Sequence, residues 1–194
     1  MTDTRNADLT FASSDFLVHI APQGTPAPTD FSDLSSPWVC LGWMTQDGST
    51  TKTNRQTKDI FASGSLAPIR TITTQQTREI QMITEEAINP QVRAVYDDVP
   101  LSDLSPTSGV ASYDLPDTDP DNRYCWIFDS WDGDHRIRDF APNGKVTARG
   151  DEKRAQTDAA QLDMTVTCYK AVDGSPSMSR LLDYGTTDVS AYFA

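Results

Sequence analysis

Hydrophobic and polar residues alternate along several stretches of the chain, and a period of two is typical of a β-strand with one buried face. The clearest stretch is residues 162–170, where the apolar set is Leu162, Met164, Val166 and Cys168. Residues 15–20 repeat the pattern, with Phe16, Val18 and Ile20 on one face. Both stretches are therefore predicted to be strands that turn one face toward a core.

The same reasoning predicts further strands at residues 38–44, 69–84, 123–131 and 135–140. The first of these is apolar on both faces, which indicates a central or covered strand. The second is long and rich in Thr and Gln, and is either one strand or a hairpin that turns near Gln75. A turn is predicted at residues 141–145, which contain Pro and an Asn-Gly pair.

One helix is predicted, and it is short. Asn89 is a good N-cap, and Pro90 suits the first helical position. Val92, Val95 and Tyr96 then fall on one face at helical spacing. The pattern predicts about two helical turns with one buried side.

The remaining segments lack regular patterns and are predicted to be loops or arms. Residues 45–58 have almost no apolar anchor, so they are expected to form a flexible loop or a loop ordered by a neighbouring subunit. The domain organisation predicted is an arm at 1–14, a β-domain at 15–170 and a second arm at 171–194. The fold class predicted is mainly β, a β-sandwich or barrel-like fold with one short helix, a long polar loop and extended terminal arms.

Composition supports strands and turns over helices. The chain holds 24 Asp but only 4 Glu, and Asp favours caps and turns. The net charge of −12 argues against specific DNA binding, which needs a basic surface. No signal-peptide pattern or membrane-span length of apolar residues is present, so synthesis in a cytoplasm without a membrane anchor is expected.

The sequence offers no good catalytic, cofactor or metal site. His19 and His135 lack a nucleophile motif, and no phosphate-binding motif is present. The Asp cluster at 117–121 lacks the glycine and glutamate of a calcium loop, and Asp129, Asp132 and Asp134 have the wrong spacing for one. The odd number of cysteines, at Cys40, Cys125 and Cys168, favours buried reduced thiols. Trp38, Trp43 and Trp126 are expected in the core, with Trp131 as the exposed tryptophan.

Taken together, the layout resembles the major tail protein of long-tailed, non-contractile phages. The features that carry the resemblance are the early strand at 15–20, the strand ending in Gly42-Trp43, the polar stretch around Asp47-Gly48 and the long Thr-rich strand that runs into the helix at Asn89. The aromatic hairpin predicted from the strands at 123–131 and 135–140, and the strand at 162–170, complete it. The resemblance covers most of the chain, as a pattern without a short diagnostic motif.

The resemblance implies a structural virion protein of the phage tail with no enzymatic activity. Such subunits form hexameric rings that stack into a tube, through which the genome passes during ejection without specific binding. Tape measure and tail terminator proteins would be further partners. In the family a long loop and the terminal arms bridge neighbouring subunits and rings. In this chain the bridging loop would be Thr45–Ile60, with a ring-stacking set of Asp47, Lys52, Arg55 and Lys58.

The family also lines its tube with one sheet. The long strand at 69–84 has few large apolar side chains, which suits a polar wall that holds no phosphate. The lumen residues predicted on it are Thr71, Thr73, Gln75 and Glu79.

Three alternatives remain from the sequence. Another phage tail part, such as a tail-completion or baseplate ring protein, would stop at one ring instead of polymerising. A β-sandwich carbohydrate-binding module would need an exposed aromatic platform. A hydrolase on a β-scaffold ranks last, since no catalytic motif supports it.

Overall fold

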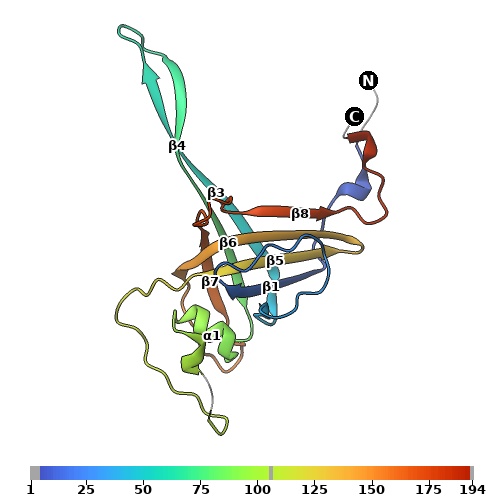
Figure 1. Cartoon of the computed structure of the whole chain (residues 1–194), viewed down its shortest axis with the longest axis vertical. Helices are drawn as coiled ribbons and strands as arrows, with labels where there is room; N and C mark the ends of the chain where they lie inside the picture. The colour runs from blue at the N-terminus through green and yellow to red at the C-terminus, as the bar shows by residue number, and fades with distance from the viewer. Residues whose placement is uncertain (1–4, 105–106, 193–194) are drawn as a thin grey trace.

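The computed structural model describes residues 5–104 and 107–192 and shows a mainly antiparallel β-structure with one α-helix (Figure 1). Its strands are β1 (Asp15–Pro22), β2 (Val39–Cys40), β3 (Met44–Phe61), β4 (Pro68–Thr84), β5 (Tyr124–Asp132), β6 (His135–Arg149), β7 (Leu162–Cys168) and β8 (Ser179–Asp183). The helices are α1 (Pro90–Tyr96) and the short 3-10 turns η1 (Ala7–Leu9), η2 (Leu101–Leu104) and η3 (Ser190–Tyr192). The predicted mainly β class with one short helix is confirmed.

The strands form one sheet in the order β2-β1-β5-β6-β7-β4-β3, with β8 paired to β6. The first half of β6 pairs with β5 and β8, and its second half pairs with β7. The two ends of the sheet meet because β2 and β3 are joined by only a few residues. There the Leu41 N–H donates to the Val18 carbonyl at 2.9 Å, and Met44 lies opposite Thr84. The sheet therefore curls around its core.

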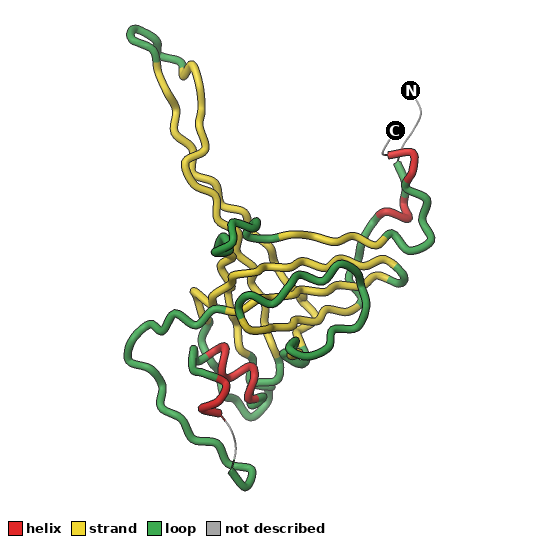
Figure 2. The backbone as a smooth tube through the Cα atoms, viewed as in Figure 1, coloured by secondary structure: helices red, strands yellow, loops and turns green. Residues whose placement is uncertain are grey.

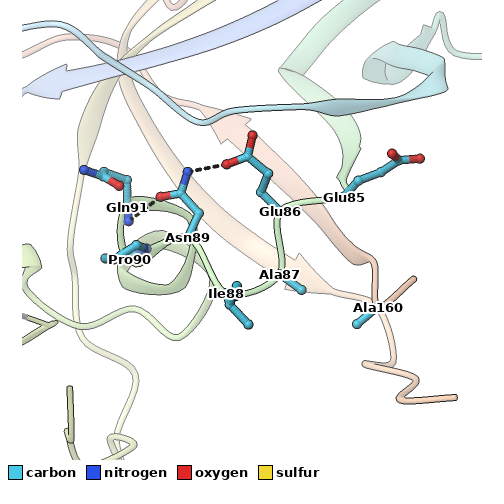
Figure 3. Close-up of a pocket in the computed structure, with 8 residues that line it drawn as sticks. All are labelled: Glu85, Glu86, Ala87, Ile88, Asn89, Pro90, Gln91 and Ala160. Carbon is cyan, nitrogen blue, oxygen red and sulfur yellow. Dashed lines mark hydrogen bonds between the residues drawn. The ribbon is translucent and has the colours of Figure 1, made fainter. Parts of the chain in front are cut away.

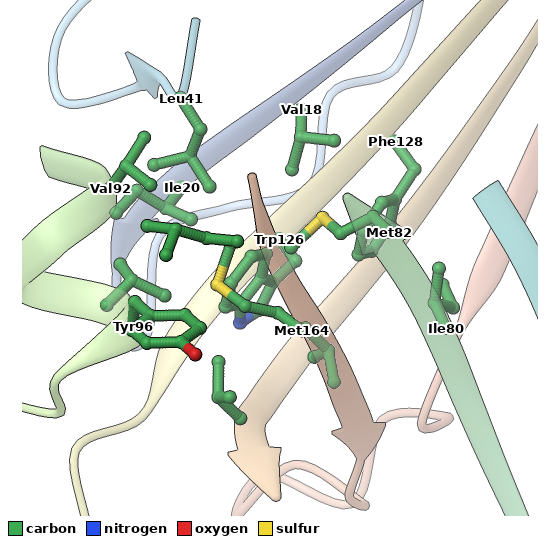
Figure 4. Close-up of a cluster of buried hydrophobic side chains, with 14 of the residues drawn as sticks. Val18, Ile20, Leu41, Ile80, Met82, Val92, Tyr96, Trp126, Phe128 and Met164 are labelled. Carbon is green, nitrogen blue, oxygen red and sulfur yellow. The ribbon is translucent and has the colours of Figure 1, made fainter. Parts of the chain in front are cut away.

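The core fills the concave side of this curled sheet (Figure 4). The alternating residues of β1 and β7 bury the faces that the sequence predicted, and Val92, Val95 and Tyr96 of α1 pack against them. Trp126 is fully buried, lies parallel to Phe128 with ring centroids 5.9 Å apart, and donates its indole N–H to the Gly144 carbonyl at 3.2 Å. A Cβ at Gly144 would stand 2.5 Å from the indole, so this position requires glycine.

A smaller apolar cluster lies on the other side of the sheet. Ala21, Cys125, Ile127 and Phe140 are covered by Leu34 and Trp38 from the long segment between β1 and β2. The Arg138 guanidinium holds this segment in place by donating to the Asp30 carbonyl at 2.8 Å. Its other nitrogens bind both oxygens of buried Asp129 at 2.7 and 2.8 Å, which keeps the buried charge paired.

The turn predicted at residues 141–145 is wrong, because these residues lie inside β6. The pairing with β5 shifts by one residue there: Trp126 lies opposite Ala141, and Tyr124 lies opposite Gly144. The extra residue is accommodated in a β-bulge around Pro142, where a missing backbone N–H is tolerated. The bulge is the place where β6 passes from β5 to β7, so a turn-like composition here bends a strand without ending it.

The polar segment at 45–60 is not a loop, because it forms most of the 18-residue strand β3. Its polarity reflects exposure on both faces, and β4 supplies its hydrogen-bond partners. The strand predicted at 38–44 is broken into β2 and the start of β3 by Gly42, which has a φ of +81°. The long strand at 69–84 is one strand, β4, and does not turn near Gln75.

Three side chains differ from their predicted environment. Trp43, predicted in the core, is 73% exposed, and Trp131, predicted at the surface, is only partly exposed. Cys40 is exposed, although Cys125 and Cys168 are buried free thiols as predicted. Burial raises the pKa of the Cys168 thiol to about 12, which keeps it protonated and unreactive.

The described residues before β1 and after β8, which belong to the two predicted arms, lie near each other at one corner of the molecule (Figure 2). The Ala12 N–H donates to Asp132 at 2.7 Å, and the Thr186 N–H donates to Asp134 at 3.2 Å, so both segments are fixed by the β5–β6 turn. Strand β8 falls within residues 171–194 and extends the sheet. The arm boundaries after residues 14 and 170 stay a prediction.

Candidate assembly surface

The most prominent surface feature is a β-hairpin that projects from the body (Figure 1). It consists of β3 and β4, and the third strand on this side, β7, pairs only with Arg78–Thr84 of β4. From Asn54 to Phe61 the ribbon therefore has two strands, and at about 3.3 Å a residue this section reaches roughly 25 Å beyond the sheet. A two-stranded ribbon is only marginally stable in water, so this section needs a partner surface to become rigid.

The four residues predicted for ring stacking lie on this hairpin. Lys52, Arg55 and Lys58 are exposed in the ordered part of β3, and Asp47 is exposed in the irregular section before Ser49. Cross-strand hydrogen bonds hold several of the polar side chains: Arg55 donates to Gln76 at 3.1 Å, and Asn54 donates to Glu79 at 3.2 Å.

The four predicted lumen residues lie on β4 of the same hairpin, but they do not share a face. Residues opposite each other in an antiparallel pair point to the same side. Thr71 and Thr73 lie opposite Asp59 and Thr57, whereas Gln75 and Glu79 lie opposite Gln56 and Lys52. The cause is a β-bulge at Thr74. Gln56 pairs with Gln75 and Thr57 pairs with Thr73, so Thr74 is left without a paired residue on β3. This extra residue shifts by one the alternation of side chains between the two faces of β4.

The two faces of the hairpin differ in charge. The face that continues from the core carries Thr71 and Thr73 together with Arg55, Asp59 and Arg78. The opposite face carries Gln75 and Glu79 together with Lys52, Lys58 and Arg70. The stacking and lumen sets predicted from sequence are thus mixed on both faces of one ribbon.

Sequence reasoning did not single out the apolar tip of the hairpin. Phe61 is 55% exposed, Leu66 fully exposed and Ile69 64% exposed. The tip has a defined turn, because the Ser65 N–H donates to the Ala62 carbonyl at 3.1 Å and its hydroxyl donates to the Ala67 carbonyl at 2.8 Å. The run of apolar residues on either side of Ser63-Gly64 was the available signal for a hairpin turn with an apolar rim.

A second exposed apolar site lies at the start of α1. Ile88 is one of its members (Figure 3), and exposed Trp43 is the other, since its carbonyl accepts from the Glu85 N–H at 2.9 Å. Glu86 organises it: its carboxylate accepts from the Trp43 N–H at 2.9 Å and from the Asn89 side chain at 2.7 Å. Asn89 in turn caps α1 by accepting from the Gln91 N–H at 3.0 Å, as predicted. A Cβ at Gly42 would stand 2.3 Å from the Glu86 carboxylate, so glycine permits this contact.

The start of α1 is also fixed from the other side. Arg93 binds both oxygens of Glu152 at 2.6 and 3.1 Å and donates to the Ala87 carbonyl at 2.5 Å. The hydrogen bonds from Arg93 and Arg154 lower the pKa of Glu152 to about 2. A cavity of about 660 Å³ lies beside this segment, bounded by residues 85–91 and Ala160 (Figure 3).

The geometry offers no cluster of metal ligands among the residues that the structure describes. Within 5–104 and 107–192, no three His, Cys, Asp or Glu side chains gather as metal ligands would. Asp119 and Asp121 instead bind Lys145 at 3.1 and 3.6 Å. In the same ranges, no helix is long and apolar enough to cross a membrane.

The projecting ribbon and the exposed apolar sites are features typical of a protein that assembles with other subunits. A family model described as phage tail tube protein matches residues 4–185, and the chain belongs to this family. It is therefore a structural component of a phage tail, located in the virion.

Solved structures and curated proteins were compared as well. A chain in the structure of the virion of a native gene transfer agent particle is 10% identical to this chain in sequence, with a TM-score of 0.42. The match covers 89% of this chain and 99% of that chain. The SPP1 tail tube has 8% identity and a TM-score of 0.42, with coverages of 92% and 81%. The baseplate of the anti-feeding prophage has 9% identity and a TM-score of 0.44, with coverages of 89% and 95%. No curated protein matches the chain significantly.

Proposed function

We propose that this tail tube protein assembles into closed rings, six subunits to a ring as the family resemblance implies, and that the β3–β4 hairpin joins successive rings into a tube that conducts the genome. The observation that carries the proposal is the two-stranded section from Asn54 to Phe61, which projects with both faces exposed. A ribbon without a third strand gains its stability from a neighbour.

Charge supports a contact role for the hairpin. Between Thr50 and Ile72 the chain has four basic residues, Lys52, Arg55, Lys58 and Arg70, and one acid, Asp59. The whole chain has a net charge of −12, so a basic projection is attracted to the acidic surface of a neighbouring copy.

The two faces of the ribbon suit different environments. The face with Thr71 and Thr73 carries mostly hydroxyl groups, and we assign it to the lumen wall. Its two arginines each donate to a neutral side chain of the same chain, Arg55 to Gln76 and Arg78 to Ser177, and Asp59 on the same face repels a phosphate. The face with Gln75 and Glu79 also carries Lys52 and Lys58, and we assign it to contacts with neighbouring subunits. Tape measure and tail terminator proteins would meet the ends of the tube.

A shortened hairpin tests the proposal. Replacing residues 54–77 by Asn-Gly connects Thr53 to Arg78, which lies opposite it, through a two-residue turn. The change keeps every β4 residue that pairs with β7. Negative-stain electron microscopy across a concentration series should show tubes for the unaltered chain and no tubes for the shortened one. Circular dichroism and thermal unfolding check that the shortened body is folded.

Each other outcome is informative. Tubes formed by the folded, shortened chain would contradict ring stacking by the hairpin. Single closed rings from the unaltered chain at every concentration would favour a tail-completion protein. A persistent monomer would count against self-assembly into rings.

A further inference from the structure

The molecule carries exposed apolar side chains at both ends of its long axis. At one end is the hairpin tip, defined here as Phe61, Leu66 and Ile69. At the other end, beside α1, is the base patch, defined here as Trp43, Glu85 and Ile88. Figure 1 shows the hairpin and α1 at opposite ends of the molecule, so the tip and the base patch cannot meet within one copy.

The tip has the properties of an anchor. Its three side chains are 55%, 103% and 64% exposed in chain order, although they stand on a defined turn. Apolar side chains gathered at the end of a projection are costly to leave in water and mark a contact site. Lys58, Asp59 and Arg70 flank the tip, and their two positive charges against one negative charge leave it weakly basic.

The base patch has the complementary properties. Trp43 is 73% exposed and Ile88 is 91% exposed, and both are attached to a backbone that is fixed by Glu86 and Asn89. Tryptophan is a residue type that often dominates the energy of protein interfaces. The side chain of Glu85 is exposed next to them.

The surroundings of the base patch are strongly acidic. The segment 97–121, which follows α1, contains seven Asp and no Lys or Arg, although Asp98 is paired with Arg149 and Asp119 and Asp121 with Lys145. The acids exceed these paired cations, so a basic tip is attracted to this end. The apolar side chains supply the contact, and the charges select which ends meet.

We infer that the hairpin tip of one copy docks on the base patch of a second copy of this chain in the next ring. The inference rests on the proposed function and adds the receiving surface, which the proposed function leaves open. Because the two surfaces differ and lie at opposite ends, the contact is head-to-tail and repeats without limit, as a growing tube requires. The single chain supplies both halves, so no other partner is needed.

Disulfide cross-linking tests the contact directly. In a Cys40→Ser background, which removes the exposed native thiol, Leu66→Cys and Ile88→Cys are combined in one full-length chain. Oxidation of the assembled tubes should give a ladder of covalent oligomers on a non-reducing gel. The matched control combines Leu66→Cys with Val172→Cys, because Val172 is exposed to 94%, similar to Ile88, but lies outside the base patch. The control should remain monomeric.

Charge reversal provides an independent measurement. Arg70→Glu and Glu85→Lys should each lower the yield of tubes by more than about tenfold, since like charges then face each other across the contact. The double variant restores the opposite charges and should recover most of the yield. Both positions are exposed, so the folded subunit should be unaffected.

The outcomes separate the inference from the proposed function. Normal tubes from both single variants, or tubes without the Leu66–Ile88 cross-link, would overturn the docking of tip on base. Those results leave ring stacking by the hairpin intact, because the stacking proposal is overturned only by tubes of the shortened chain. A ladder confined to closed rings, with no species larger than one ring, would place the tip within the ring and also overturn the inference.

Discussion

At the scale of single residues, paired charges fix the segments that carry the exposed surface. Arg138 binds Asp129 through two hydrogen bonds and holds the segment between β1 and β2 through the Asp30 carbonyl. Arg93 plays a similar part at the other end by linking Glu152 to the start of α1. Both guanidiniums bind carboxylates through two nitrogens, a geometry that lysine cannot reproduce.

The Arg93–Glu152 pair makes stability depend on pH. The pKa of Glu152 in the folded chain is about 2, below its ordinary value of 4.5, because Arg93 and Arg154 donate hydrogen bonds to it. A lowered carboxyl pKa stabilises the fold above pH 4.5, and this contribution is lost as the pH falls from 4.5 toward 2. Glu152→Gln should therefore cost about 1.5–3 kcal/mol at pH 7 and progressively less in acid.

Urea unfolding of the free subunit at pH 7 and near pH 3 measures this difference. Glu85→Gln is the matched control: its side chain is exposed, and its effect should stay within about 0.5 kcal/mol. A cost of Glu152→Gln that is the same at both pH values would show that the ion pair does not contribute as described.

At the scale of elements, the hairpin and the body have different sources of stability. The body strands bury one face on Trp126 and its neighbours, whereas the distal ribbon buries neither face. The bulge at Thr74 increases the twist of the ribbon. Beyond it, toward the tip, each β4 side chain lies on the face opposite to the one that strict alternation from Glu79 would give. The ribbon is therefore the element whose order depends on neighbours.

Hydrogen exchange detected by mass spectrometry should reveal this difference. In the free subunit, amides of residues 54–72 should exchange at least about tenfold faster than those of β5, because local opening of a two-stranded ribbon costs little free energy. In assembled tubes the same amides should become protected. Slow exchange of residues 54–72 in the free subunit would show that the ribbon is stable without a partner.

At the scale of the whole molecule, two electrostatic effects oppose each other. Copies with a net charge of −12 repel one another, while the basic hairpin attracts the acidic end of a neighbour. Repulsion between whole subunits acts over longer distances and is screened first, since the Debye length is already about 10 Å at 0.1 M salt. Attraction between groups in contact is screened at higher salt.

The yield of tubes should therefore pass through a maximum as sodium chloride is raised from about 0.02 M to about 1 M. Sedimentation of tubes at constant protein concentration measures it. A variant with Arg70→Gln and Glu85→Gln lacks the charges at the contact, so its decline at high salt should be weaker. A yield that rises steadily to 1 M salt would show that the charges of the hairpin do not contribute to stacking.

The sequence by itself determined the elements whose burial repeats with a local period. Strands β1 and β7 and the capped helix α1 occur where the pattern placed them, because each buries one face at regular spacing. The mainly β class and the resemblance to tail proteins followed from the same patterns, and the family match agrees with both.

Only the tertiary structure decided the features that depend on long-range pairing. Residues 45–60 lack apolar anchors and form a strand because β4 lies beside them, which no local pattern reveals. The faces of Thr71 and Gln75 depend on a one-residue bulge in that pairing, and a shift of one residue exchanges the two sides of a strand. The exposure of Trp43 is likewise decided by the tertiary structure, because hydrophobicity predicts that a side chain tends to be buried but not which segment will cover it.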